Sequence, residues 1–560
     1  MQDKFNKGTF DSDKMLSCRT LYKANGFTDD DFKRPVIGIC DSFSDIVPGH
    51  NNLRQISQEV KNGIYRAGGT PVEFGCIAVC DGVCTTHEGA NYSLPSRDIV
   101  ADGIEIMARA HKLDGLVLVG SCDKTVPGML MAAARLDIPS IFIAGGCMLG
   151  GPAFGEKRKS DSTSAQEAQG MYQTGKISYE ELMNISDACC PTTGSCQHMA
   201  TANSMCIIAE ALGMSIPGSA MIPAVYNERL RAAFKTGETI VEMVLKGLTA
   251  RDIITPASIR NTIKLMMAVG GSTNCIIHIC AIAHEIGLST DQVMGWFEEY
   301  GQSVPLIAKI NPASYEYDAE DFYKAGGVPA VQKEIDSIIE KGCMTVTGKM
   351  AEENYNEYIN LYGKNEEVIT SLEKPFSTLA GLAVMHGNIA PDTAVAKPAA
   401  ISEEVRVFKG RAVCFDSEEA ANQAIEEQKI KAGDVVVIRY VGPKGAPGMP
   451  EMFKPMKLLY GQGLNKCTAL ITDGRFSGTN NGCFVGHISP EAAASGPIAL
   501  IEDGDEITID VINRELILHV SDEELAKRKD NWHYQPKELT GYLKRYARDV
   551  LSADKGAILK

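Results

Sequence analysis

The amino-acid sequence predicts an α/β domain, in which helices flank a parallel sheet, followed by a smaller domain rich in β-strands. Three observations lead to this fold class. β-rich runs alternate with helical stretches early in the chain, these runs end abruptly in polar turns, and short strands dominate after about residue 385. Alternating strands and helices are typical of a parallel sheet, and ligands bind such sheets at the carboxyl ends of their strands.

The expected strands of the first domain are short apolar runs, each followed directly by a polar or thiol side chain. These strands cover residues 34–40 before Asp41, 72–80 before Asp81, 113–121 before Cys122 and 138–146 before Cys147. The helical stretches between them cover residues 53–68, 96–111 and 129–136. Since the carboxyl ends of parallel strands share one edge, we expect the reactive side chains to gather there.

The predicted secondary structure changes twice along the rest of the chain. Residues 198–350 are mostly helical, whereas short strands follow at residues 405–415, 434–441, 468–474 and 506–520. We therefore predict one domain at residues 1–385 and a second, β-rich domain at residues 386–560. The polar residues 155–167 predict an exposed loop.

The composition argues against several classes of partner. The chain has 560 residues, of which 44% are hydrophobic and 22% charged, and its net charge is −16. Such an acidic chain is not expected to bind nucleic acid or an anionic membrane. It lacks an apolar run of the ~18 to 20 residues that a bilayer crossing needs, and residues 1–10 contain no signal-like apolar segment, so we expect a cytoplasmic protein. Its 17 cysteines are then expected to be buried, catalytic or metal-bound rather than cross-linked.

Several motifs of known chemistry are absent from the sequence. There is no G-x-x-x-x-G-K-[ST] phosphate loop, no G-x-G-x-x-G that opens a helix after a strand, no H-E-x-x-H and no paired C-x-x-C. Nucleotide-dependent and zinc-dependent chemistry are therefore unsupported.

The turn at Gly120–Gly128, GSCDKTVPG, places a thiol, a carboxylate and an amine side by side between a strand and a helix. Cys122 offers a soft thiolate suited to iron, and Asp123 offers a hard oxygen suited to a magnesium-type ion. A charged lysine has no lone pair for a metal, so Lys124 would be a ligand only as a carbamate and is otherwise a counter-charge. The alternative is a helix start capped by Asp123 beside an inert cysteine.

Two further turns favour metal chemistry at this edge. Cys196 lies in a Gly/Ser/Thr-rich turn just before a helix, whose positive end is expected to favour the thiolate. Asp81 stands at the end of another strand. One such turn is weak support, whereas three in one parallel sheet predict a metal centre.

Eight longer stretches, taken together and in order, resemble the dihydroxy-acid dehydratase and phosphogluconate dehydratase family. The similarity runs from about Arg34 to Arg528. The stretches are THEGANYSLPSRDIVADGIE, CDKTVPGMLMAA, TANSMCIIAEALGMSIPG, GGSTN, GNIAPD, GDVVVIRYVGPKGAPGMPEM, LITDGRFSG and GHISPEAA.

The resemblance implies an iron–sulfur cluster, of the 2Fe-2S or 4Fe-4S type, and a magnesium ion at the interface between the α/β domain and a barrel-like, swivelling second domain. By this match Cys122 and Cys196 would hold the cluster, and Ser477 would be the catalytic base. The magnesium ligands would be Asp81, Asp123, Lys124 as a carbamate, and Glu451. Taken alone, Ser477 is typical of a turn and Glu451 of a solvated carboxylate. The resemblance also implies a homodimer or a homotetramer.

The sequence departs from this family at Gly49. Relatives with a two-iron cluster carry a third ligating cysteine at this position, and glycine cannot bind iron. Either another thiol substitutes, or the cluster is held differently, or it is absent. Cys80 and Cys84, which flank Asp81, are the substitutes to test first, although both are equally typical of small core residues at a strand end.

The stretch SCQHM is a second departure, because Gln197 and His198 replace the two glycines of the branched-chain enzymes. These polar, bulky side chains favour a sugar acid, such as an aldonate, over a branched-chain dihydroxy acid. In contrast, the stretch HEGANYSLPSR looks more like the branched-chain group.

We therefore expect a hydro-lyase that binds a small hydroxy acid and dehydrates a 2,3-dihydroxy carboxylic acid to a 2-keto acid. Magnesium on the carboxylate and C2 hydroxyl would stabilise the charge formed at C2, and iron would act as a Lewis acid on the C3 hydroxyl. The alternative substrate is the branched-chain 2,3-dihydroxy acid of valine and isoleucine biosynthesis. A non-catalytic iron–sulfur sensor is the alternative from another class, suggested by Gly49 and the many thiols, although the intact motifs around Glu451 and Ser477 argue against it.

Overall fold

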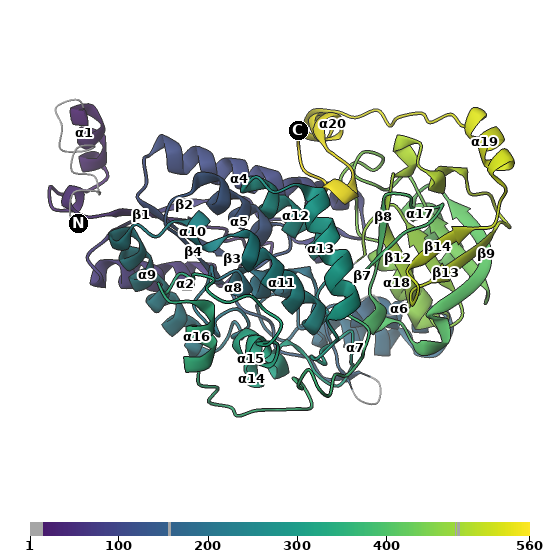
Figure 1. Ribbon diagram of the computed structural model, residues 1–560, viewed down its shortest axis with the longest axis horizontal. Helices are drawn as coiled ribbons and strands as arrows, with labels where there is room; N and C mark the ends of the chain where they lie inside the picture. Colours follow the sequence, from purple (N-terminus) through teal and green to yellow (C-terminus); the bar gives the residue numbers. More distant parts are fainter. Residues whose placement is uncertain (1–14, 155–157, 477, 479–481) are drawn as a thin grey trace.

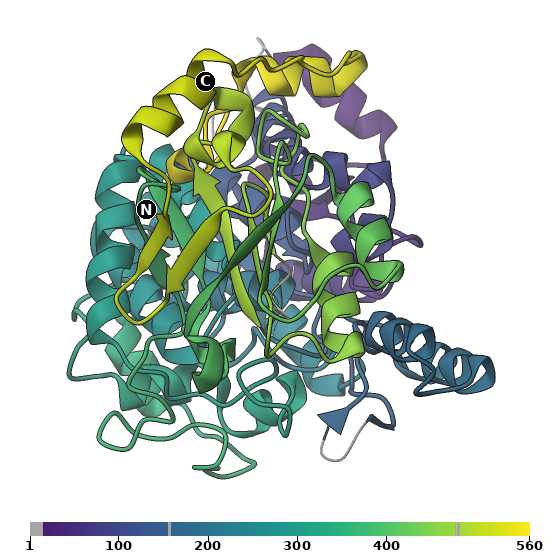
Figure 2. The same ribbon diagram turned by 90° about the vertical axis from the view of Figure 1, so that its right-hand side faces the viewer.

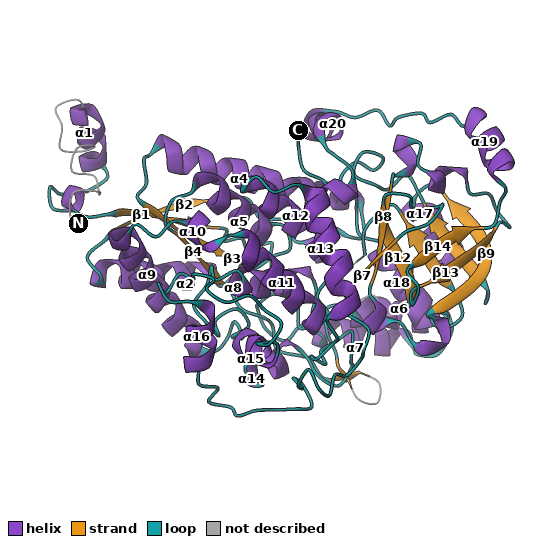
Figure 3. Cartoon of the chain, in the orientation of Figure 1, coloured by secondary structure: helices purple, strands orange, loops and turns teal. Residues whose placement is uncertain are grey.

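The described residues form two large sheets, each packed among helices, besides one two-stranded ladder, and this arrangement confirms the predicted fold class (Figure 1). The structure is a computed structural model that describes residues 15–154, 158–476, 478 and 482–560. Figure 3 shows one group of strands within the N-terminal part and the other at the opposite end of the molecule.

The first sheet has four parallel strands in the order β2-β1-β3-β4. Its strands are β1 (Val36–Asp41), β2 (Thr70–Gly75), β3 (Gly115–Gly120) and β4 (Ser140–Ala144). Every residue of β1, β3 and β4 is buried, as expected for a parallel sheet that is covered on both faces. The second strand does not extend to Cys80 as predicted, because its one partner β1 ends at Asp41, which pairs with Gly75.

Helices α2 and α9 pack together on one face of this sheet, and α5 packs on the other with α4 beside it. These helices are α2 (Leu53–Arg66), α4 (Ser93–Ala110), α5 (Thr125–Leu136) and α9 (Asn227–Lys246). Glycine allows α2 and α9 to cross closely. A Cβ atom at Gly63 would lie 2.0 Å from the carbonyl oxygen of Phe234, and one at Gly237 would lie 2.1 Å from that of Val60.

The remaining helices of the N-terminal part surround this core. Helix α1 lies apart from the body, and none of its residues is buried (Figure 1). Residues 198–350 are mostly helical, as predicted. The bounds are α1 (Leu16–Ala24), α3 (Asp81–Cys84), α6 (Ser164–Gln173), α7 (Tyr179–Ala188), α8 (Thr201–Ala211), α10 (Ala250–Ile253), α11 (Pro256–Val269), α12 (Cys275–Glu285), α13 (Thr290–Ser303), α14 (Ala319–Lys324), α15 (Gly327–Glu334) and α16 (Ala351–Glu357). A two-stranded ladder of β5 (Ala153–Phe154) and β6 (Arg158–Lys159) lies before α6.

The second sheet has eight strands in the order β14-β13-β9-β10-β11-β12-β8-β7. An isolated bridge between His386, next to β7, and Glu515 of β14 brings the two edges together, so the sheet is nearly closed like a barrel. Its interior is apolar and includes Val435, Ile471 and Ile507. The strands are β7 (Ala383–Met385), β8 (Thr393–Ala396), β9 (Val407–Phe415), β10 (Asp434–Ile438), β11 (Ala469–Thr472), β12 (Cys483–Ser489), β13 (Glu506–Asp510) and β14 (Glu515–Leu518). Since β7 pairs with β8, the second sheet begins before residue 386, and the domain boundary at 385 stays a prediction.

The described residues of the C-terminal part also form four α-helices, and the last residues return to the N-terminal part. Figure 2, which looks onto the second sheet, shows the C-terminal helices along the top of the molecule. The helices are α17 (Glu418–Glu426), α18 (Phe453–Gln462), α19 (Asp522–Asp530) and α20 (Gly541–Asp549). No helix in the described part of the chain combines the length and apolar character that a bilayer crossing requires.

Candidate active site

A cavity of about 430 Å³ opens at the carboxyl edge of the first sheet. The N-terminal part supplies most of its lining, and the C-terminal part supplies Glu451 and Phe453. The lining includes Gly49 after β1, Cys80 and Asp81 after β2, Cys122 and Asp123 after β3, and Cys196 and His198 before α8. The strand ends thus bring together side chains that are far apart in the sequence.

Three buried carboxylates form the hard side of this cavity. Asp81, Asp123 and Glu451 each offer one oxygen, and these oxygens all lie within 4.8 Å of one another. Burial raises the pKa of Glu451 to about 8 and that of Asp123 to about 6, and the negative charge of Asp81 adds to both shifts. Such crowded carboxylates repel one another, so the group attracts a cation.

The ammonium group of Lys124 lies among these carboxylates. Its Nζ atom is 2.7 Å from Asp81 Oδ2, 3.6 Å from Asp123 Oδ2 and 3.8 Å from Glu451 Oε1. Burial alone would raise the pKa of Asp81, but the charges of Lys124 and Arg475 outweigh it and lower this pKa. Helix α5 begins at Thr125 with Lys124 as its N-cap and no side-chain cap, so the alternative in which Asp123 caps this helix is wrong.

Three residues that the sequence analysis did not single out hold the carboxylates in place. Ser93 Oγ donates to Asp81 Oδ1 at 2.5 Å. Glu451 Oε1 accepts from Asn274 Nδ2 at 2.6 Å and from Arg475 Nη1 at 2.9 Å. All three lie inside stretches that carried the family resemblance, SLPSR, GGSTN and GRFSG, and that location was the signal available for finding them.

Thiols form the soft side of the same cavity. Cys80, Cys122 and Cys196 line it, and so does the exposed Cys190. The interaction between the Cys80 and Cys122 thiols lowers the pKa of Cys80 and, together with burial, raises that of Cys122. The expectation that a helix start favours the thiolate of Cys196 is wrong for this structure. Helix α8 begins only at Thr201, and burial raises the pKa of the Cys196 thiol.

The structure separates the two substitutes for the missing third cysteine. A Cβ atom at Gly49 would lie 3.0 Å from Cys122 Sγ, so position 49 adjoins the thiols but offers no ligand. Cys80 lines the cavity, whereas Cys84 does not; its buried thiol lies 3.5 Å from the carbonyl oxygen of Asp81. Cys80 is therefore the thiol that the geometry places beside Cys122.

Ser477, the predicted base, lies outside the described residues, but both of its neighbours in the chain are described. The carbonyl oxygen of Phe476 accepts from Asn274 Nδ2 at 3.3 Å. That of Gly478 accepts from Lys397 Nζ at 3.2 Å. Phe476 and Glu451 therefore both accept from the Asn274 amide.

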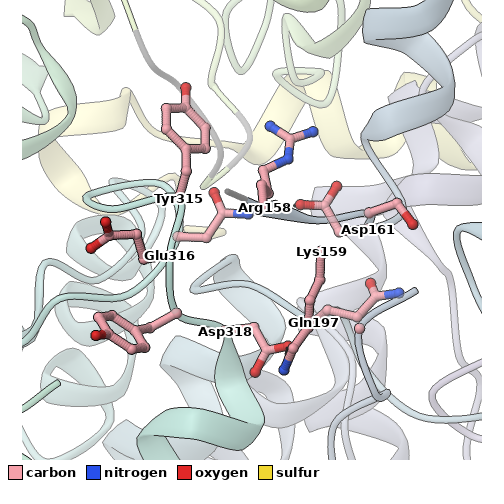
Figure 4. Close-up of a pocket in the computed structure, with 11 residues that line it drawn as sticks. Arg158, Lys159, Asp161, Gln197, Tyr315, Glu316 and Asp318 are labelled. Carbon is pink, nitrogen blue, oxygen red and sulfur yellow. Dashed lines mark hydrogen bonds and ion pairs between the residues drawn. The ribbon is translucent and has the colours of Figure 1, made fainter. Parts of the chain in front are cut away.

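Gln197 and His198 take different positions. Gln197 Nε2 donates to the carbonyl oxygen of Cys189 at 3.0 Å, and Gln197 Oε1 accepts from the amide of Ser162 at 3.3 Å. The Gln197 side chain lines a separate small polar pocket (Figure 4). His198, in contrast to Gln197, lines the cavity that contains the carboxylates and thiols. The expectation that both side chains point toward the substrate is therefore wrong for Gln197, because backbone groups already use its amide.

The polar stretch before α6 is not an exposed loop, as far as it is described. Arg158, Asp161 and Glu167 are buried, and the carboxylate of Glu167 pairs with Arg158 at 2.8 Å and with Lys457 of α18 at 2.8 Å. The prediction is wrong because charge is not by itself a sign of exposure. Arg158 and Glu167 pair with each other within this stretch, and distant parts of the sequence supply Lys457 to Glu167 and Asn311 to Asp161.

Comparison with known proteins identifies the family. Residues 34–354 match the family model described as dihydroxy-acid/6-phosphogluconate dehydratase N-terminal, and residues 367–557 match the one described as C-terminal. The chain belongs to the dihydroxy-acid/6-phosphogluconate dehydratase family. It is therefore a dehydratase, a lyase that removes water, as the sequence analysis predicted.

The relatives of this dehydratase match it along almost their full length. It is 50% identical to the dihydroxy-acid dehydratase of Lachnospira eligens over 545 residues, 97% of this chain and 96% of the relative. It is 47% identical to the dihydroxy-acid dehydratase of Pyrococcus furiosus over 544 residues, 97% of each chain. It is 46% identical to that of Clostridium kluyveri over 561 residues, 100% of this chain and 99% of the relative. These names do not support the preference for a sugar acid and agree better with the dihydroxy-acid alternative.

Proposed function

We propose that this dehydratase converts a 2,3-dihydroxy carboxylic acid with a short, branched apolar tail into the corresponding 2-keto acid. The observation that carries the proposal is that one cavity brings three carboxylates together with the thiols of Cys80, Cys122 and Cys196. The tail is that of the branched-chain alternative, which agrees better than a sugar acid with the names of the relatives. The lining itself offers both apolar side chains, such as Val83, Met148 and Phe453, and hydroxyl groups, such as those of Thr85 and Ser162.

The carboxylate group fits a magnesium ion. Magnesium prefers oxygen ligands, and these buried oxygens already surround a positive charge, the Lys124 ammonium. Asp81, Asp123 and Glu451 would hold the ion. Lys124 would join them as a carbamate, which replaces the ammonium with an oxygen ligand.

The thiol group fits an iron–sulfur cluster. Cys122 and Cys196 are the ligands that the family resemblance implies. Cys80 supports the same assignment because its thiol lines the same cavity and interacts with that of Cys122. Thiolates are the ligands that hold such clusters in proteins. If these three thiolates held a four-iron cluster, one of its irons would have no protein thiolate and could bind another ligand.

The reaction breaks the C2–H and C3–O bonds and releases water. When bound, magnesium and iron supply Lewis acidity to the carboxylate with the C2 hydroxyl and to the C3 hydroxyl, respectively. We assign the removal of the C2 proton to Ser477. Arg475 and Asn274 keep the carboxylate of Glu451 fixed throughout. The enol that remains takes up a proton at C3 and becomes the 2-keto acid.

Turnover by anaerobically purified protein tests this proposal. The protein is supplied with magnesium and either a five-carbon 2,3-dihydroxy acid with a branched tail or a six-carbon aldonate, and the keto acid is trapped as its hydrazone. We expect keto acid from the branched acid and at least tenfold less from the aldonate. A preference for the aldonate would contradict the proposed substrate, and full activity in iron-free protein would contradict the role of the thiols.

A further inference from the structure

We infer that Lys397 is a positioning residue that holds the segment containing Ser477 where proton removal requires it. Lys397 directly follows β8 and lies outside the cavity lining. The inference rests on the proposed function, because Ser477 is the proposed base.

Lys397 is buried without a counter-ion among the described residues. Its side chain is fully buried, and Nζ donates to the carbonyl oxygen of Gly478 at 3.2 Å. Two other lysines are equally buried, and each pairs with a carboxylate at 2.7–2.8 Å: Lys124 with Asp81, and Lys457 with Glu167. An unpaired buried ammonium is costly, and burial lowers the pKa of Lys397 to about 7. The hydrogen bond to the Gly478 carbonyl oxygen accounts for a lysine at this buried position.

The pairing of strands explains how Lys397 reaches this segment. Strands β8 and β12 are antiparallel, and Ala396 at the end of β8 pairs with Val485 near the start of β12. The next residue, Lys397, therefore lies beside the point where the chain enters β12. The segment containing Ser477 leads into that strand.

The backbone just before α8 also packs closely against Gly478. A Cβ atom at Gly478 would lie 2.5 Å from Ala200 Cα and 2.8 Å from the carbonyl oxygen of Met199. The backbone at Gly478 is thus packed against the start of α8, and its carbonyl oxygen is held by Lys397. A glycine is required at 478 for this close approach.

The residue on the other side of Ser477 is also anchored. Asn274 Nδ2 donates to the carbonyl oxygen of Phe476 at 3.3 Å and to Glu451 Oε1 at 2.6 Å. Ser477 therefore lies between two anchored residues, one tied to a proposed magnesium ligand and one tied to Lys397. Because a displacement of about 1 Å can cost about 100-fold in rate, loss of either anchor is expected to slow proton removal.

The test compares the Lys397→Met variant with Lys457→Met in the holoenzyme. Lys457 is the matched control, because it is a buried lysine that pairs with Glu167 instead of donating to Gly478. Hydrogen–deuterium exchange is measured on peptides that span residues 470–490. Turnover is measured with the dihydroxy acid and with the same acid deuterated at C2.

We expect faster exchange in the 470–490 peptides of Lys397→Met and normal exchange there in Lys457→Met. We also expect kcat of Lys397→Met to fall about 100-fold with little change in KM and a larger C2 deuterium isotope effect. A variant that merely unfolds in part would lose active sites and keep the normal isotope effect.

Unchanged exchange in Lys397→Met, or an isotope effect equal to that of the unmutated enzyme, would overturn the inference. The exchange measurement does not depend on substrate. If the unmutated enzyme dehydrated no dihydroxy acid, the proposed function would fail, whereas the exchange result would still decide whether Lys397 anchors the segment.

Discussion

At the scale of single residues, the site depends on which of two cysteines faces the cavity. Cys80 precedes α3 in an extended conformation, and Cys84 is the last residue of this short helix. Because Asp81 lies between them and points at Lys124, the two thiols are held in different surroundings. The Cys80 thiol interacts with that of Cys122. The Cys84 thiol is buried instead, and this burial raises its pKa to about 12.

Replacing each cysteine with serine tests this difference. We expect Cys80→Ser to lose most of its iron and its visible absorption after anaerobic reconstitution, because a hydroxyl is a poor ligand for the cluster. Cys84→Ser should retain both. Iron and sulfide are measured per chain, and the melting temperature shows that both variants are folded. Equal iron content in the two variants would mean that Cys80 is not a ligand.

Residue types showed which chemistry the site offers, but not which side chains serve it. A thiol next to a carboxylate in the turn around Cys122 could be read from the sequence alone. The roles of Asn274 and Arg475 could not, because each reaches Glu451 only through folding of distant segments. The amide of Gln197 likewise finds its partners in the backbone of other segments.

At the scale of elements, the first sheet depends on a close crossing of α2 and α9. These helices approach where Gly63 faces the backbone at Phe234 and Gly237 faces the backbone at Val60. The pattern of apolar residues predicts helix α2, but Gly63 within it gives no sign of a contact with α9. Likewise, β2 ends where its partner strand β1 ends. The periodicity of the β2 sequence carries no information about the length of β1.

The crossing predicts opposite effects for two glycine-to-alanine substitutions. Gly63→Ala places a methyl group against the backbone of α9 and should lower the free energy of unfolding by about 1–3 kcal/mol. Gly103→Ala in α4, where no atom lies within 4 Å of the added Cβ, should raise it by about 0.5–1 kcal/mol. The shift of the urea midpoint measures both. A neutral Gly63→Ala would show that the helices can separate without cost.

At the scale of the whole molecule, the last residues of the chain bind the two halves together. Arg97 of α4 is fully buried and donates to the carbonyl oxygens of Gly556 at 3.0 Å and Ala557 at 2.8 Å. Tyr546, Val550 and other C-terminal residues pack against Leu94 and Ile277 of the N-terminal part. The last residues of the chain therefore pack against its N-terminal part.

Loss of Arg97 is expected to loosen the C-terminal segment. Arg97→Met leaves two buried carbonyl groups and Asp98 without their charged partner and should cost about 3 kcal/mol. Limited proteolysis should then cut near residue 540 sooner than in the unmutated protein. Arg548→Met, which removes an exposed arginine from α20, is the control and should leave the cleavage rate unchanged. Equal protection in Arg97→Met would contradict this role.

The central claim is that thiols and carboxylates of one cavity act on the same substrate through two different metals. Anomalous diffraction from an anaerobic crystal, with Mn²⁺ in place of magnesium and the dihydroxy acid bound, tests it most directly. The account predicts an iron signal at Cys80, Cys122 and Cys196, a manganese signal among Asp81, Asp123 and Glu451, and the acid between them. Iron bound away from these thiols, or an acid that reaches one metal and not the other, would contradict it.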